Sequence, residues 1–85
     1  MPASRALVAI ADYAKQDLTF QPAAAEGTER WHIRLGSREF ELLLRGVRFF
    51  DTRTRAGGGG AVDLAMHLLD VDFRGAVRAL QDASL

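Results

Sequence analysis

The chain has no cysteine, which excludes a disulfide framework, a thiol nucleophile and a thiolate metal site. It has only two histidines, too few for a structural metal site built from histidine alone. No apolar run approaches the roughly 18 residues that a membrane span needs, and the N-terminus lacks the layout of a signal peptide. We therefore expect a cytoplasmic protein that uses no metal and no other cofactor.

A net charge is also lacking, because eleven basic and eleven acidic side chains cancel. This balance excludes a strongly basic nucleic-acid binder of the usual kind. The 85 residues, of which 48% are hydrophobic and 26% charged, fit one small globular domain over residues 1–85. Such a domain seldom builds both a core and an elaborate cleft, so we expect no enzymatic activity.

The charges are nevertheless segregated along the chain. Residues 30–55 hold seven arginines against three carboxylates, a balance of +4, while residues 1–29 and 56–85 each have a balance of −2. Arginine suits bidentate phosphate contacts and stacking on bases. The alternative is that these arginines only keep the exposed faces of strands soluble.

The N-terminal segment has helical periodicity. The spacing of the apolar residues from Leu7 to Ala14 predicts a helix that Ser4 caps and that ends near residues 15–16. Residues 17–20 are expected to be extended or irregular, and residues 21–28 to form a loop.

From Trp31 the apolar period changes from 3.6 to 2, which predicts strands. Gly36-Ser37 suits a two-residue hairpin turn, because glycine tolerates the positive φ that such turns need. This turn fixes the register of the hairpin. The predicted pairs are Leu35 with Arg38, Arg34 with Glu39, Ile33 with Phe40, His32 with Glu41, and Trp31 with Leu42.

A second tight turn is predicted at Arg45-Gly46, which would complete a three-strand meander. It would place Val47 and Phe49 on the core face, and Arg48 and Phe50 on the other face. The predicted pairs are Leu44 with Val47, Leu43 with Arg48, and Leu42 with Phe49. Residues 51–55 are expected to be a fourth short strand or a loop.

Two helices are predicted after the glycine run 57–60, which we expect to interrupt the chain. The first spans residues 61–69, and Asp72 caps the second. Its predicted buried stripe consists of Phe73, Ala76, Val77 and Leu80. The fold class is therefore α+β, a small antiparallel meander of three or four strands flanked by an N-terminal helix and two C-terminal helices.

The glycine run precedes a helix, where successive backbone N–H groups can hold a phosphate. The Lys-Ser or Lys-Thr end of a nucleotide P-loop is missing, however, and Ala61-Val62 stands in its place. Nucleotide hydrolysis is therefore not expected. A connector, or a close approach of the backbone to another group, is favoured over a phosphate cradle.

Asp63, His67 and Asp70 share one face of the predicted helix over residues 61–69. A metal site or an acid–base pair could be drawn from them, but no further nitrogen or sulfur ligand completes a zinc site. A polar stripe with a weak Asp63–His67 surface ion pair is the favoured interpretation. A small hydrolase built on this pair ranks last, because no nucleophile accompanies it.

The face of the meander away from the core is the most informative part of the sequence. Its members, with the two arginines that follow, are His32, Arg34, Glu39, Glu41, Leu43, Arg48, Phe50, Arg53 and Arg55. An exposed aromatic ring among arginines suits single-stranded nucleic acid, which needs base stacking and phosphate contact. The alternative is that the N-terminal helix covers Leu43 and Phe50, so that both faces are buried.

The order of motifs from residue 31 to residue 82 resembles a known family. These motifs are the aromatic pair Phe49-Phe50 followed by Asp51, then Gly57 to Met66 (GGGGAVDLAM), then Asp72 to Leu80 (DFRGAVRAL). They resemble the N-terminal Cys-His-Cys-Cys zinc-finger domain of bacterial-type DNA primases, which is zinc-ribbon-like. The spacing is most specific over residues 49–80.

The chain departs from that family at the zinc ligands. The CxxC knuckle would fall on Thr52 and Arg55, and the Cys-His knuckle near Trp31 and Arg34, so the ligands are lost. The chain is thus similar to metal-free versions in plasmid and mobile-element replication proteins. Its fold would depend on packing of a predicted core. That core is Trp31, Ile33, Phe40, Leu42, Phe49, Leu64, Leu68, Phe73, Val77 and Leu80.

The resemblance implies a non-catalytic DNA-binding module of a primase or replication system that engages single-stranded template. The nucleic-acid-binding residues we expect are Arg34, Arg45, Arg48, Phe50, Arg53 and Arg55. The alternative is a protein-interaction adaptor that docks a primase, polymerase or helicase of a mobile element. An exposed Leu43–Phe50 patch with few arginines would indicate the adaptor, and a continuous arginine stripe would indicate DNA.

Overall fold

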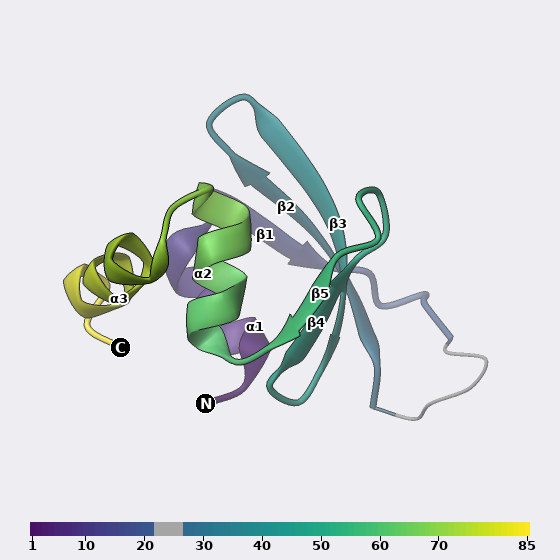
Figure 1. Ribbon diagram of the computed structural model, residues 1–85. Coiled ribbons are helices and arrows are strands. Elements are labelled where there is room, and N and C mark those ends of the chain that lie inside the picture. The colour runs from purple at the N-terminus through teal and green to yellow at the C-terminus, as the bar shows by residue number, and fades with distance from the viewer. Residues whose placement is uncertain (22–26) are drawn as a thin grey trace.

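A computed structural model describes residues 1–21 and 27–85, and its elements form one antiparallel sheet with three helices. The strands follow one another in space in chain order, and Figure 1 shows all three helices on the same side of the sheet. This confirms the predicted α+β class, with five strands where three or four were expected. The predicted loop over residues 21–28 lies largely outside the described residues. The elements are α1 (Ala3–Ile10), β1 (Tyr13–Gln16), β2 (Glu29–Leu35), β3 (Arg38–Arg45), β4 (Arg48–Asp51), β5 (Gly57–Gly59), α2 (Ala61–Leu69) and α3 (Phe73–Asp82).

The β2–β3 hairpin has the predicted turn and all five predicted pairs. Gly36 has φ +60°, and Ser37 is not among the residues with positive φ, which is the pattern of a type II′ turn. Ile33 and Phe40 face each other on the buried side. Turn chemistry and hydrophobic alternation agree here, which explains why the prediction is right.

The β3–β4 register differs from the prediction by two residues. The turn is Gly46-Val47, with Gly46 at φ +58° in the same first position that Gly36 occupies. Leu44 therefore pairs with Phe49, and Val47 lies in the turn, 47% exposed, not in the core. The consecutive leucines of β3 allow either register, because an apolar residue faces inward in both. A shift of two preserves the faces, so the predicted sides of β4 are correct.

The predicted first helix is wrong beyond residue 10. Ser4 lies inside α1, which starts after Pro2 without a side-chain cap, and residues 13–16 form strand β1 beside β2. Ala14 still packs against the core, opposite Ile33. An inward position of Ala14 is compatible with either a helix or a strand. Residues 13–16 form a strand because they pair with the otherwise open edge of β2.

The glycine run is part of the sheet, not an interruption. Three glycines form edge strand β5, which pairs with β4 and ends where α2 begins. Helix α2 has the predicted bounds, and Asp72 caps α3 as predicted, since its Oδ1 accepts a hydrogen bond from the Gly75 N–H at 2.8 Å. The sheet therefore gains a strand without side chains.

The core lies between the sheet and the three helices. Phe73, which was expected inside, is 63% exposed, because it is the first residue of α3 and this helix reaches the core only from Ala76 onward. Trp31 and Val77 are partly buried, and the remaining predicted core residues are buried. The buried apolar residues are Ala3, Ala6, Leu7, Ile33, Phe40, Leu42, Leu44, Phe49, Leu64, Ala65, Leu68, Ala76 and Leu80.

Candidate nucleic-acid interface

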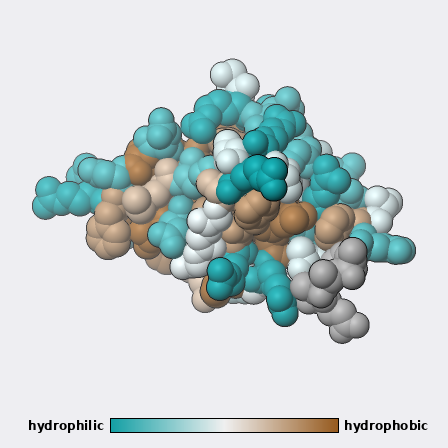
Figure 2. All heavy atoms as spheres, turned by 45° about the vertical axis from the view of Figure 1, so that its right-hand side comes forward, coloured by the Kyte–Doolittle hydropathy of each residue, from teal (hydrophilic) through white to brown (hydrophobic). Residues whose placement is uncertain are grey.

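The side of the sheet away from the helices is open along β3 and β4. Helix α1 packs on the core side, with Ala3, Ala6 and Leu7 buried there, so it does not cover this face. Phe50 is 40% exposed, and Leu43, its partner across the strands, is half-buried. Figure 2 brings this side of the molecule forward and shows apolar groups at its centre with hydrophilic groups around them. We call it the open face.

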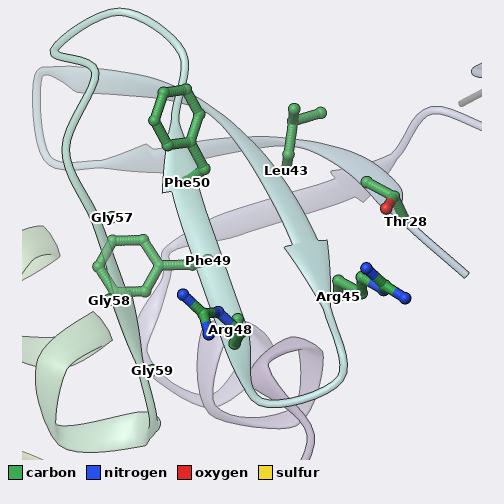
Figure 3. Close-up of a pocket in the computed structure, with 9 residues that line it drawn as sticks. All are labelled: Thr28, Leu43, Arg45, Arg48, Phe49, Phe50, Gly57, Gly58 and Gly59. Carbon is green, nitrogen blue, oxygen red and sulfur yellow. The ribbon is translucent and has the colours of Figure 1, made fainter. Parts of the chain in front are cut away.

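A hollow of about 610 Å³ lies on the open face. Arg45 and Arg48 are direct partners across the β3–β4 pair at one end of it, and Leu43 and Phe50 are partners farther along the same strands (Figure 3). One wall is the backbone of β5. The lining residues are Thr28, Leu43, Arg45, Arg48, Phe49, Phe50, Gly57, Gly58 and Gly59.

The two arginines of the hollow lack acidic partners within the described residues, where neither forms an ion pair. Like charges placed directly opposite each other across two strands repel, so this pair favours an anion between them. Because the guanidinium group offers several donors in one plane, the arrangement suits a phosphate. The hollow thus combines an aromatic ring, an apolar floor and two cations.

The other end of the open face has a different electrostatic character. Nε of Arg30 lies 3.5 Å from Oε2 of Glu41, and His32 lies between two carboxylates, 2.7 Å from Oε1 of Glu41 and 3.2 Å from Oε1 of Glu39. We call these four residues the charge ladder. Its acids offset its bases, so a continuous arginine stripe does not form.

The structure brings together three of the six predicted binding residues, Arg45, Arg48 and Phe50. Arg34 lies on β2 with its guanidinium carbon 5.6 Å from the centre of the Tyr13 ring. Nη1 of Arg53 donates to the carbonyl of Glu39 at 3.3 Å, and Arg55 sits in the turn after β4 with φ +61°. These three arginines do not line the hollow.

The inward side of β4 holds a polar pair that the sequence did not indicate. Asp51 is 1% exposed, and its Oδ2 accepts a hydrogen bond from Nε2 of His67 at 2.7 Å. The His67 ring lies against Phe49, with 5.4 Å between ring centres. His67 therefore pairs with Asp51 and not with Asp63, whose Oδ2 accepts from the Gly59 N–H at 3.3 Å. The predicted Asp63–His67 ion pair is wrong.

Asp51 also organises the turn that follows it. Its Oδ1 accepts hydrogen bonds from the backbone N–H groups of Arg53, at 2.9 Å, and Thr54, at 3.2 Å. Burial by itself raises the pKa of Asp51, but the hydrogen bonds from His67 and these two N–H groups outweigh it and hold the pKa below 3.8. The position of Asp51, two residues after core Phe49 on the same side of β4, was a signal that its carboxylate is buried, but it did not identify the partner.

The part of the chain that the structure describes contains no group of three or more histidine and acidic side chains arranged to hold a metal ion. None of its helices is long and apolar enough to cross a membrane.

Comparison with known proteins gives one partial similarity. The chain is similar to a "65 kDa protein" of Zymomonas mobilis subsp. mobilis, with 40% identity over 43 residues. These residues are 51% of this chain, which spans only 7% of the length of that protein. No protein-family profile matches the chain, and no solved structure matches it significantly.

Proposed function

We propose that this protein is a non-catalytic DNA-binding module of a primase or replication system and that it engages single-stranded template on its open face. The observation that carries the proposal is the hollow in which Phe50 lies beside Arg45 and Arg48. Aromatic rings stack on unpaired bases, and arginines bind the phosphates on either side. Both groups are needed for single strands, and both are found here within one hollow.

The open face suits a single strand better than a duplex. Double-stranded DNA is read by elements that enter a groove, such as a helix or a protruding β-ribbon. Here the arginines and the ring lie on the surface of a short sheet, and a base must leave its stack to reach Phe50. The proposed ligand is therefore an unpaired strand, bound with little sequence preference.

The remaining predicted arginines have a secondary role in this proposal. Arg53 and Arg55 lie on the turn after β4 and extend the positive region beyond the hollow, and Arg34 lies near the end of β2. Phe50 and Asp51 lie between Arg48 and this turn along β4, and Arg34 is on β2 beyond His32 of the charge ladder. They contribute long-range attraction to the phosphate backbone rather than contacts inside the hollow.

The family resemblance of residues 31–82 supports a replication setting, because the implied role of that domain is template engagement. In this proposal the fold has dispensed with the zinc ion, and Asp51 with His67 ties the turn after β4 to helix α2. The chain works without catalytic activity of its own and beside a primase or polymerase.

The second candidate is a protein-interaction adaptor that docks a primase, polymerase or helicase. One observation favours it: the charge ladder interrupts the arginine stripe, while Leu43 and Phe50 form an apolar patch on the open face. An apolar patch with a polar border is typical of a protein-binding surface. Binding measurements separate the two candidates.

The test is fluorescence anisotropy of a labelled single-stranded DNA over a salt series, with duplex as competitor. We expect the double variant Arg45→Gln/Arg48→Gln to bind at least about tenfold more weakly, with a salt slope shallower by about 1.4 if each arginine neutralises one phosphate. The control variant Arg74→Gln/Arg78→Gln removes the same charge from α3 and should bind as the unmodified protein does.

Three results would contradict the proposal. They are an absence of binding at low salt by a folded protein, an equal loss in the control variant, and tighter binding of duplex than of single strand. Tighter binding of an RNA oligonucleotide of the same length would contradict a DNA template in particular. Absence of all nucleic-acid binding would favour the adaptor.

A further inference from the structure

The three glycines of β5 differ in how strongly the fold requires them. A Cβ atom on Gly58 would lie 2.9 Å from both Cε1 of Phe49 and Cβ of Asp63, on the core side. A Cβ atom on Gly57 would lie 2.9 Å from the backbone oxygen of Phe49. Real Cβ atoms do not approach other atoms so closely, so packing alone accounts for glycine at these two positions.

Gly59 has no such requirement. The nearest atom to its added Cβ would be Cγ of Arg48 at 3.9 Å, an ordinary contact, and Gly59 is not among the glycines with positive φ. Where the backbone conformation tolerates a side chain, glycine makes a protein less stable than alanine does, because glycine loses more conformational freedom on folding. Folding therefore disfavours glycine at position 59.

A side chain at position 59 would project into the hollow. Gly59 is the cross-strand partner of Arg48 (Figure 3). Directly opposed residues present their side chains on the same face of a sheet. For position 59 this is the open face, on which Arg48 and Phe50 lie. Gly59 also lines the hollow. Gly59 is the last residue of β5, and glycine is a usual choice where a ligand approaches the backbone closely.

We propose that the hollow holds one unpaired base and that Gly59 lacks a side chain so that this base fits. The base stacks on the exposed Phe50 ring, which itself lies beside Gly57, with Cδ1 of Phe50 3.4 Å from the position of a Gly57 Cβ. Arg45 and Arg48, at one end of the hollow, hold the phosphate backbone next to the base. This inference rests on the proposed function and adds to it a base-binding subsite with Gly59 as the residue that determines its size.

The dimensions agree with this ligand. The hollow of about 610 Å³ is within the range of about 300–1,000 Å³ found for small-molecule pockets. Its floor is apolar at Leu43, and its two cations lie together at one end, which matches a base with a phosphate of the strand at that end. Among residues 1–21 and 27–85, no acidic side chain lines it.

The experiment compares two oligonucleotides of equal length and charge, oligo(dT) and a fully abasic strand. We measure both affinities by anisotropy for the unmodified protein and for Gly59→Ala, Gly59→Val and Arg45→Gln/Arg48→Gln. Chemical denaturation of each variant shows that it is folded, and we expect Gly59→Val to be at least as stable as the unmodified protein.

The unmodified protein should prefer oligo(dT) by about tenfold, the size of one stacking interaction. Gly59→Val should lose this preference while it keeps the affinity for the abasic strand, and Gly59→Ala should lose part of it. The double arginine variant should weaken binding of both strands equally and keep the preference. This opposite pattern separates the base subsite from the phosphate contacts.

Two outcomes would overturn the inference alone. They are equal affinity of the unmodified protein for both strands, and an undiminished preference in Gly59→Val. In either case binding of single strands, and with it the proposed function, would stand. Failure of the unmodified protein to bind either strand would instead refute the proposed function together with the subsite.

Discussion

Strand β4 presents its four residues to two different environments. Phe49 and Asp51 face the helices and are buried, while Arg48 and Phe50 face the hollow and are exposed. Each side has one aromatic and one charged residue. The carboxylate on the inner side is hydrogen-bonded to His67, whereas the guanidinium group on the outer side has no ion-pair partner among the described residues. One short strand can thus stabilise the fold through one face and present groups for ligand binding on the other. The two properties should therefore separate on mutation.

The largest effect is expected on the inner side. Asp51→Ala leaves His67 and the N–H groups of Arg53 and Thr54 without their acceptor, and should lower the free energy of unfolding by about 3 kcal/mol. Chemical denaturation measures this change. Affinity of the folded variant for single-stranded DNA should stay within about twofold. A loss of affinity as large as that of Arg45→Gln/Arg48→Gln would show that the inner face of β4 also contributes to binding.

The same residue predicts a pH dependence. Because the pKa of Asp51 is held below 3.8 in the folded protein, its contribution to stability is fully present above that value and is lost as the pH falls through the folded pKa. The difference in stability between the unmodified protein and Asp51→Ala should therefore narrow below pH 3.8. Denaturation at pH 7 and at pH 2 to 3 tests this, and a constant difference would show that the carboxylate charge is not its source.

A smaller effect is expected on the outer side, in binding. Phe50→Ala removes the stacking ring and should weaken binding of single-stranded DNA by about tenfold, which is about 1.4 kcal/mol. Phe50→Trp should retain binding. Phe73→Ala is the matched control, since Phe73 is also an exposed phenylalanine but lies on α3. Equal loss in both alanine variants would indicate nonspecific apolar binding.

The smallest effect is expected at the turn where β4 ends. Arg55 has φ +61°, a conformation that glycine adopts without the strain of a side chain, so Arg55→Gly should raise the free energy of unfolding by about 0.5 kcal/mol. Binding should fall by less than threefold, because Arg55 lies outside the hollow. A tenfold loss would place Arg55 in the interface and enlarge the binding surface beyond the outer side of β4.

Much of the fold could be predicted because local rules agree with the packing. Alternation from Trp31 and a glycine at the first turn position give the complete register of the β2–β3 hairpin. The same rules fail for β3–β4, where three consecutive leucines fit two registers and only the position of Gly46 in its turn decides. The failure shifts the pairing by two residues, so the faces of Phe49 and Phe50 are still predicted correctly.

The candidate site was predictable in part for the same reason. Face alternation places Arg48 and Phe50 together, and the pairing of β3 with β4 brings Arg45 beside them. The hollow itself was not predictable, because its wall is a strand of three glycines that has no hydrophobic pattern. The Asp51–His67 pair joins residues 16 apart on a strand and a helix, and no local signal indicates that they meet.

Local sequence patterns are sufficient to specify the α+β class, the β2–β3 hairpin, helix α2, the Asp72 cap of α3 and the sides of β4. These features depend on periodicity, turn residues and caps, which act between neighbours in the chain. The tertiary structure decided that residues 13–16 and 57–59 are strands, that the helices leave one sheet face open, and that Asp51 is buried against His67. Each of these features depends on contacts between segments that are distant in the sequence. A distant segment pairs with a free edge of the sheet, or it shields a polar group such as Asp51 from water.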